Sequence, residues 1–426
     1  MVISRDFVVS MFLISATLGI AISYSKIYLF HISLLFLALY FLLILLNNNL
    51  TITKTKTFTK LHYFFFVMLA WYSLALFWSI DTQSTFVYLF YILCGVSIAL
   101  TIVYYTSNQE KLDKVFKIVA AVFLIEIIFS LLEVFTSFRL PISPYSNYLS
   151  FFGKTDIDLG NVHLLVGDVP TGFRWNPNNL ATTMTLIFPF ILLHPKRLVK
   201  YIGSIAIIVL VISSESRGNI LAMSAIFILF TYLTNRRRAL IFGSFFAVAG
   251  ILFLFFVAPL MEQSDNYKIR RAHSSFASAQ EYLLIDANSR NDSIGVRKTL
   301  IDQGIEGLKN SYGLGVGGGA STSLGSVRGI ESMHNFWIEI LVEGGVLFFI
   351  AFLIWYLTLL NNLRRAAKSS DKRISYFATA SLISLVGFVF GAISTSSVIY
   401  FFPMWILFGF AIATINHYKR SKYIRG

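Results

Sequence analysis

The chain has 426 residues, of which 56% are hydrophobic and only 13% are charged, and its formal net charge is +14. So much apolar surface excludes an ordinary soluble domain, and several apolar runs reach the roughly 20 residues that a helix needs to cross a bilayer. We therefore expect an all-α integral membrane protein. The basic residues lie in short clusters between the apolar runs, which argues against nucleic acid as a partner despite the positive charge.

Hydropathy predicts about 12 transmembrane helices. Their approximate ranges are 6–24, 27–46, 61–80, 84–105, 117–135, 178–194, 201–214, 218–234, 239–259, 336–360, 375–394 and 398–416. The first run, Phe7–Tyr24, is followed by no small-residue cleavage site, so we interpret it as a retained anchor. The only cysteine, Cys94, lies in the fourth span and can form no internal disulfide.

The distribution of Lys and Arg predicts the orientation of these spans. With a cytoplasmic N-terminus, most of the 35 Lys and Arg residues fall in short inner segments, which is the positive-inside pattern. Both termini are then cytoplasmic, and two long loops, 136–177 and 260–333, face outward. We divide the chain into residues 1–259 with spans 1–9, the large outer loop 260–333, and residues 334–426 with spans 10–12.

The large outer loop contains two features with predictable local structure. A short amphipathic helix on the membrane surface is expected over 296–309, because apolar residues recur there at helical spacing: Val296, Leu300, Ile301, Ile305 and Leu308. Tyr312 and the glycines after it end this helix. The glycine run GLGVGGG at 313–319 suits either a flexible linker or the approach of backbone N–H groups to a phosphate.

Three arginines are the outer cations best suited to an anionic substrate. Arg217, in the segment SSESRGN, lies in a connection of a few residues and is therefore held at the outer membrane boundary, close to Glu215. A guanidinium there suits a phosphate or carboxylate; alternatively, it pairs with Glu215 or snorkels to the interface. Arg297 on the amphipathic helix is either a ligand or a surface charge. Arg174, beside Trp175, is either a ligand or an interfacial anchor.

His334 precedes the tenth span in the segment SMHNFWIEILVEGG. A free imidazole titrates near pH 6.5, so a neutral histidine at an interface can accept a proton from a hydroxyl; alternatively, it caps the helix. In the other outer loop, Asn178 and Asn179 are placed to cap the sixth span and lie close to Arg174 in sequence. We include Asn178 and Glu215 with Arg174 as further candidates for substrate binding.

Two acidic pairs lie inside predicted spans. Glu126 and Glu133 share one face of span 5, and Glu339 and Glu343 share one face of span 10. Ionisable groups at membrane depth usually face a cavity or a partner. They are either functional or hydrogen-bond anchors, and we assign them no catalysis.

The sequence has no His, Cys, Asp and Glu cluster with metal-ligand spacing, no GxxxxGK[ST] segment and no outer DxD pair. We therefore expect neither metal nor cofactor, and the absence of these motifs disfavours ATP-driven transport and a sugar-nucleotide donor. A lipid-linked donor presented from the bilayer fits better.

Several short motifs, in this order and on one side of the membrane, resemble those of the O-antigen ligase and O-antigen polymerase superfamily. They are Pro170–Asn178, Ser216-Arg217-Gly218, Gly295-Val296-Arg297, Ile305-Glu306-Gly307, the glycine segment 313–317, His334-Asn335 and Glu343-Gly344-Gly345. Each motif is unspecific alone, whereas the resemblance in topology covers nearly the whole chain.

The resemblance implies a metal-independent, inverting glycosyltransferase at the periplasmic face of a bacterial inner membrane. Its donor would be a glycan on undecaprenyl diphosphate. Arg217 and Arg297 would hold the diphosphate leaving group, and His334 would be the general base on the acceptor hydroxyl. Arg174 is a weaker addition to this set.

Three functions remain open on the sequence. A ligase transfers the glycan to lipid A-core, whereas a polymerase uses a second lipid-linked repeat as acceptor. The arrangement of an arginine followed later in the chain by a His-Asn pair favours the ligase slightly. A lipid-linked oligosaccharide flippase is the alternative from another class, but a transporter needs cations deep along a transmembrane path, and the ionisable residues well inside these spans are acidic.

Overall fold

The computed structural model describes residues 4–46, 58–154, 169–234, 293–326, 332–395 and 399–425, together with the single residues Arg237, Ile241 and Ser244. The predicted span 239–259, except Ile241 and Ser244, and about half of the loop 260–333, including Arg270, Arg271 and Arg290, lie outside the described residues. Within them, the elements are α1 (Arg5–Leu18), η1 (Gly19–Ala21), β1 (Ser23–Tyr24), β2 (Ile27–Tyr28), α2 (Leu29–Leu46), α3 (Tyr63–Ala75), α4 (Thr82–Tyr105), α5 (Gln109–Phe135), η2 (Leu149–Phe152), α7 (Pro177–Leu192), α8 (Arg197–Ser213), α9 (Arg217–Thr234), α13 (Ser293–Asn310), η5 (Ala320–Leu324), α14 (Phe336–Ala366), α15 (Lys372–Gly391) and α16 (Phe402–Arg425).

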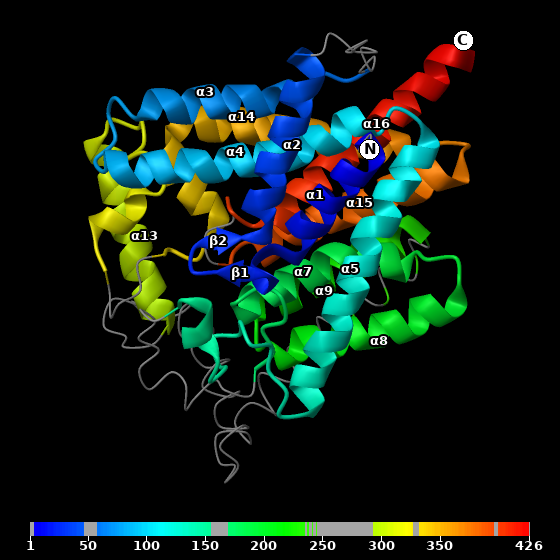
Figure 1. Cartoon of the computed structure of the whole chain (residues 1–426), viewed down its shortest axis with the longest axis horizontal. Coiled ribbons are helices and arrows are strands. Elements are labelled where there is room, and N and C mark those ends of the chain that lie inside the picture. The colour runs from blue at the N-terminus through cyan, green and yellow to red at the C-terminus, as the bar shows by residue number, and fades with distance from the viewer. Residues whose placement is uncertain are drawn as a thin grey trace.

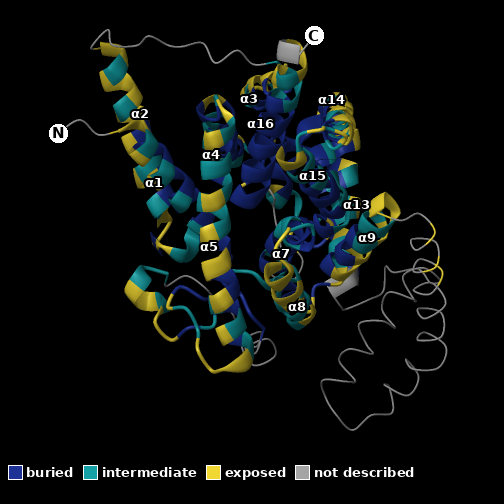
Figure 2. Cartoon of the chain, turned by 90° about the vertical axis from the view of Figure 1, so that its right-hand side faces the viewer, coloured by how far each residue is buried: buried dark blue, intermediate teal, exposed yellow. Residues whose placement is uncertain are grey.

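Within the described residues the chain is an all-α membrane protein. The strands found there, β1 and β2, form one small antiparallel hairpin. Every predicted span that falls within the described residues overlaps a helix. Six helices among them are long and apolar enough to cross a bilayer: α2, α4, α5, α9, α14 and α15. In α2 only 11% of the apolar window is buried, and this helix lies apart from the buried core in Figure 2. Its exposed leucines suit contact with lipid.

The core of the bundle is built around α15, which packs against α7, α9, α14 and α16. Hydroxyl groups join these helices: Ser384 donates to the Leu186 carbonyl at 2.6 Å, and Tyr376 donates to the Phe190 carbonyl at 2.6 Å. Glycine allows the closest approach, because a side-chain carbon at Gly409 of α16 would lie 2.9 Å from the Ala99 backbone of α4. Small residues and interhelical hydrogen bonds are the usual means of packing helices in membranes.

The glycine run 313–319 is packed against a break in α14. Gly345 has φ 80° and ψ 170°, which interrupts the helix and frees backbone groups around it. Val316 and Gly317 donate their N–H groups to the carbonyls of Val342 and Glu343 at 2.9 and 3.2 Å. A side-chain carbon at Gly315 would lie 2.5 Å from the Glu343 carbonyl oxygen. The run is therefore packed structure and not a flexible linker, and two of its N–H groups are donated to α14.

Candidate functional site

Arg217 begins α9 directly after a tight connection. Helix α8 ends at Ser213, so residues 214–216 are the whole link between the two helices, as the sequence predicts. Glu215 has a φ of 55°, the left-handed conformation that reverses the chain in so few residues. The side chains of Glu215 and Arg217 are exposed, whereas Ser216 between them is buried. The connection therefore holds the guanidinium at one end of the bundle.

Asn219 fixes this end of α9 in the bundle. Its buried amide lies within hydrogen-bonding distance of the Asn178 carbonyl on α7, at 3.3 Å, and of the Ser394 hydroxyl after α15, at 3.2 Å. Its carbonyl oxygen accepts from Thr185 at 3.1 Å. Asn219 is not among the predicted site residues. The sequence feature that could have indicated it is an amide directly after Ser-Arg-Gly at the start of an apolar helix.

The amphipathic helix predicted over 296–309 is α13, which begins at Ser293 and ends at Asn310. Val296 and Leu300 are buried in a small apolar cluster with Met333 and Val342. A side-chain carbon at Gly304 would lie 2.6 Å from the Met333 methyl group, so α13 lies directly on the segment before α14. In Figure 1, α13 stands at the end of the bundle opposite the C-terminal end of α16.

His334 lies between α13 and α15. Its φ of 50° is left-handed, and its N–H donates to the Ser332 hydroxyl at 3.2 Å. The next residue, Asn335, caps α14 by accepting from the Trp337 and Ile338 N–H groups at 3.2 and 3.3 Å. The cap is therefore Asn335, and the interpretation of His334 as the cap is wrong.

The end of α15 brings the segments of Arg217 and His334 together. Phe336, two residues after His334, donates its N–H to the Ala392 carbonyl at 3.1 Å. Ser394, two residues further along, lies 3.2 Å from the Ser216 hydroxyl, directly before Arg217. Two segments more than 100 residues apart in sequence therefore meet on one turn.

Arg297 lies within electrostatic range of both Arg217 and His334. Burial lowers the pKa of Arg297, and the charge of Arg217 lowers it further. Burial, followed by the charge of Arg297, lowers the pKa of His334 to about 4. One cation, Arg297, thus lies near an imidazole that is neutral at physiological pH, and a second cation, Arg217, lies near Arg297. This arrangement can bind an anion and accept a proton beside it.

Arg174 lies in a buried ion pair. Its guanidinium donates to both Glu126 carboxylate oxygens, at 2.8 and 2.6 Å, and to the Thr17 carbonyl at 2.9 Å. The side chains of Arg174 and Glu126 are 5% and 0% exposed. Glu133 on the same helix accepts from the Thr171 and Gly172 N–H groups, both at 2.8 Å. Both glutamates of α5 therefore anchor the loop before α7.

We expect Arg174→Met to destabilise the protein by about 3–5 kcal/mol, because it leaves the Glu126 carboxylate buried without its cation. Thermal unfolding of the solubilised protein measures this loss. Adding Glu126→Leu should recover part of it, since no uncompensated charge then remains. An Arg174→Met protein that unfolds at the wild-type temperature would show that the ion pair contributes nothing.

Asn178 lies in the first turn of α7, but it does not cap the helix. The cap is Asn176, whose side chain accepts from the Asn178 N–H at 2.8 Å, and Pro177 occupies the first helical position, where a missing N–H does no harm. The predicted caps, Asn178 and Asn179, lie inside the first turn of the helix, after the observed cap. The role of Asn178 in substrate binding stays a prediction, as do those of Glu215 and Arg174.

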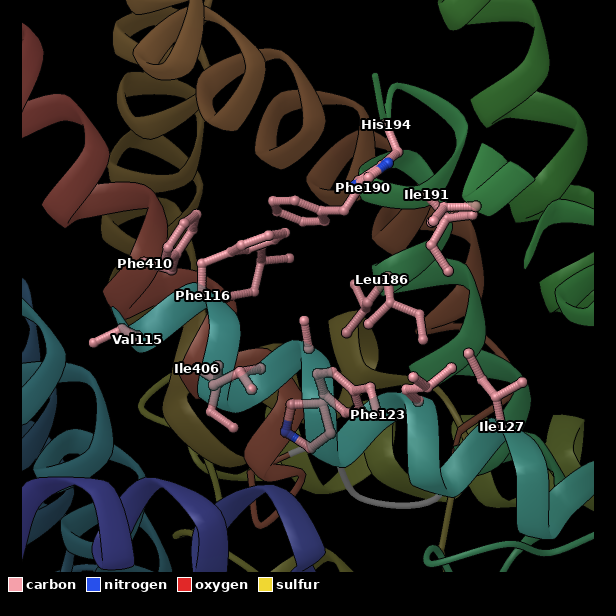
Figure 3. Close-up of a pocket in the computed structure, with 17 residues that line it drawn as sticks. Val115, Phe116, Phe123, Ile127, Leu186, Phe190, Ile191, His194, Ile406 and Phe410 are labelled. Carbon is pink, nitrogen blue, oxygen red and sulfur yellow. The ribbon is translucent and has the colours of Figure 1, made fainter. Parts of the chain in front are cut away.

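An apolar pocket of about 250 Å³ lies between α5, α7 and α16. Figure 3 shows Phe116 and Phe123 of α5 and Phe190 of α7 around it, and the Phe116 and Phe190 ring centroids are 5.9 Å apart. None of the candidate site residues is among those that line it. Apart from His194, its walls are apolar or aromatic and suit hydrocarbon.

Comparison with known proteins agrees with the motifs. A model of the O-antigen ligase family matches residues 202–353, a range that includes Arg217, Arg297 and His334. The chain is also 24% identical over 367 residues to the teichuronic acid biosynthesis protein TuaE of Bacillus subtilis (strain 168), covering 82% of this chain and 70% of the relative. These matches support the resemblance to the O-antigen ligase and polymerase superfamily.

The superfamily and the six apolar helices together make the chain a multi-pass membrane protein. The matches support a biosynthetic glycosyltransferase of the O-antigen ligase or polymerase kind.

Proposed function

We propose that the protein transfers a glycan from undecaprenyl diphosphate to a sugar hydroxyl, with inversion and without a metal ion, and that it is a ligase with lipid A-core as acceptor. The observation that carries this proposal is that Arg297 lies within electrostatic range of both Arg217 and His334, and that the segments of Arg217 and His334 meet at the end of α15. This arrangement supplies two cations and one neutral base.

The reaction needs charge balance at the leaving group. As the bond between the anomeric carbon and the diphosphate oxygen breaks, negative charge grows on the diphosphate. Guanidinium groups suit this charge, because their planar donors can bind two phosphate oxygens at once. Arg217 and Arg297 would bind the diphosphate and stabilise it as it leaves.

His334 would act on the acceptor. The acceptor oxygen attacks the anomeric carbon as the diphosphate leaves from the opposite face, so a single displacement inverts the configuration. The hydroxyl proton passes to the neutral imidazole of His334. Bound diphosphate would offset the charge of Arg297, which raises the pKa of His334 and makes it a stronger base when the donor is present.

The lowered pKa of His334 predicts a pH profile. The neutral imidazole is the active form and its fraction rises with pH, so the acid limb of kcat/KM, which reports free enzyme, should lie near pH 4. The acid limb of kcat should lie at higher pH, because donor is bound. Initial rates across pH 4–8 measure both limbs. A kcat/KM limb near pH 6.5, the value of an unperturbed imidazole, would contradict the geometry.

The polymerase is the second candidate. The matching family model is described as O-antigen ligase, which favours lipid A-core as acceptor. The relative, in contrast, is a teichuronic acid biosynthesis protein, and this favours a polymerase that adds lipid-linked repeats to one another. Both use the same donor chemistry and differ in the acceptor.

Reconstitution in vesicles separates these functions. The purified protein is given one undecaprenyl-diphosphate-linked glycan with either lipid A-core or a second lipid-linked repeat. Glycan on lipid A-core supports the ligase, and a ladder of lengthening products supports the polymerase. Movement of the intact lipid-linked glycan across the bilayer, with neither product, would overturn the proposal in favour of a flippase.

We also propose about 12 membrane crossings, with both termini in the cytoplasm and the site on the periplasmic face of the inner membrane. The three-part division at residues 259 and 333 follows from it. The clusters of Lys and Arg in the short predicted inner segments support this orientation. Cysteine labelling from either side of the membrane tests it: Tyr312→Cys, at an exposed position, should react from the periplasm.

A further inference from the structure

A second pocket lies beside His334, and the reaction proposed above leaves it without a ligand. We call it the tyrosine–glutamate pocket. It has a volume of about 290 Å³ and lies between α4, η5 and α14, with Tyr88, Tyr91, Ser321, Glu339, Glu343 and Tyr400 among its lining residues. Ser332 and Met333 also line it, so the pocket extends to the two residues that directly precede the candidate base His334.

The polar side chains of this pocket are held in place. Tyr88 donates to Glu339 Oε1 at 2.9 Å, and Ser321 donates to Glu343 Oε1 at 2.6 Å. A side-chain carbon at Gly318 would lie 2.5 Å from the Tyr88 ring, so the glycine run lies directly against this wall. Fixed polar groups around a cavity are typical of a binding site.

One oxygen in the pocket lacks a partner. Glu343 is 1% exposed, and its Oε2 atom has no hydrogen-bond partner in the structure. A buried acceptor in this state costs free energy, so a ligand that donates a hydrogen bond would stabilise it. On another wall, the rings of Tyr91 and Tyr400 lie with centroids 5.1 Å apart and offer apolar faces.

We propose that the tyrosine–glutamate pocket binds one neutral sugar residue of the acceptor glycan and directs its hydroxyl toward His334. This inference rests on the proposed glycosyl transfer. Sugar hydroxyls can donate to Glu343 Oε2, and the C–H face of the ring can lie on tyrosine. The lining residues that the structure describes include no Lys or Arg that could bind a diphosphate, which separates acceptor from donor. The volume is at the lower end of the ~300–1,000 Å³ range of small-molecule sites, as one monosaccharide requires.

The first test is a kinetic split with Glu343→Gln. Glutamine keeps a carbonyl oxygen for the Ser321 hydroxyl but turns the unpartnered acceptor into a donor. We expect the KM for the acceptor to rise about tenfold, because the sugar hydroxyl loses its hydrogen-bond acceptor. The KM for the donor should not change. An unchanged acceptor KM, or a donor KM that rises equally, would overturn the pocket.

The second test measures binding without transfer. Saturation-transfer NMR on the full chain in nanodiscs uses methyl glycosides of glucose, galactose and N-acetylglucosamine as probes. Wild type should bind at least one probe, and Glu343→Gln and Tyr91→Ala should bind it about tenfold more weakly. The matched control, Tyr201→Ala, alters an exposed tyrosine on α8 and should bind as wild type does.

These experiments test the sugar-binding pocket and the proposed glycosyl transfer independently. Wild-type protein that transfers no glycan, but binds a glycoside through Glu343, would overturn the proposed function and leave the sugar pocket supported. Wild-type protein that transfers glycan, but binds none of the probes, would overturn the pocket alone. Variants that lose thermal stability with no change in glycoside binding would show a purely structural role and also overturn it.

Discussion

His334→Ala should reduce glycan transfer from an undecaprenyl-diphosphate donor by about 10²–10⁴-fold, because the acceptor hydroxyl then has no base to take its proton. The imidazole lies near Arg297 and is already neutral, so it can accept the proton without first losing one. The measurement is product formation by purified protein at saturating donor and acceptor. The KM values should change little, since the base acts in the transition state.

The backbone at His334 calls for a second variant. Its φ of 50° is strained for alanine, whereas asparagine adopts this conformation readily. His334→Asn should therefore reach the membrane at wild-type levels and still be inactive. The matched control is His194→Ala, which removes an imidazole from the apolar pocket and should leave transfer intact. A His334→Asn protein with the wild-type rate would remove the base from the mechanism.

Local patterns predict the features of this fold that depend on local contacts. Apolar runs locate the helices, because the bilayer requires a continuous apolar surface of a given length. The amphipathic helix is right within a few residues, since burial of Val296 and Leu300 follows helical spacing. The short connection before Arg217 is also confirmed, because two long apolar runs leave no other residues to join them.

Long-range contacts could not be predicted in the same way. The Arg174–Glu126 pair joins residues 48 positions apart, and the local sequence around either residue does not predict its contact with the other. The glycine run suited either a flexible linker or a phosphate-binding segment, because its actual partner is the break at Gly345, which resembles an ordinary helical glycine in sequence. The cap shifted to Asn176 because Pro177 fits the first helical position. A single sequence shows the helical spacing of its apolar residues, but it does not show which distant residues will contact one another.

The candidate site combines both kinds of information. Arg217 and His334 could each be picked out locally, as a cation at a helix boundary and an imidazole before a span. Their meeting depends on Ala392 and Ser394 at the end of α15, which hold the two segments through a backbone contact and a serine pair. Neither residue carries a motif. The positions of the site residues were therefore predictable, and the scaffold that joins them was not.

Arg217→Lys should reduce transfer by about 10²–10³-fold although the charge is kept, because an ammonium cannot present two parallel donors to a diphosphate. The loss should fall mainly on kcat, since the charge on the leaving oxygen grows only as the bond breaks. Steady-state kinetics with varied donor measure it. The matched control is Arg139→Lys, where the guanidinium donates to the Glu133 carbonyl at 2.9 Å, and this variant should transfer normally.

Arg297→Lys extends this prediction to the second cation. If both arginines bind one diphosphate, the double variant should lose less than the product of the two single losses, because removing either donor already misplaces the leaving group. If each bound a separate anion, the losses would multiply. A double-mutant cycle on kcat distinguishes the two. Multiplying losses, or an Arg217→Lys enzyme within twofold of wild type, would contradict a shared diphosphate site.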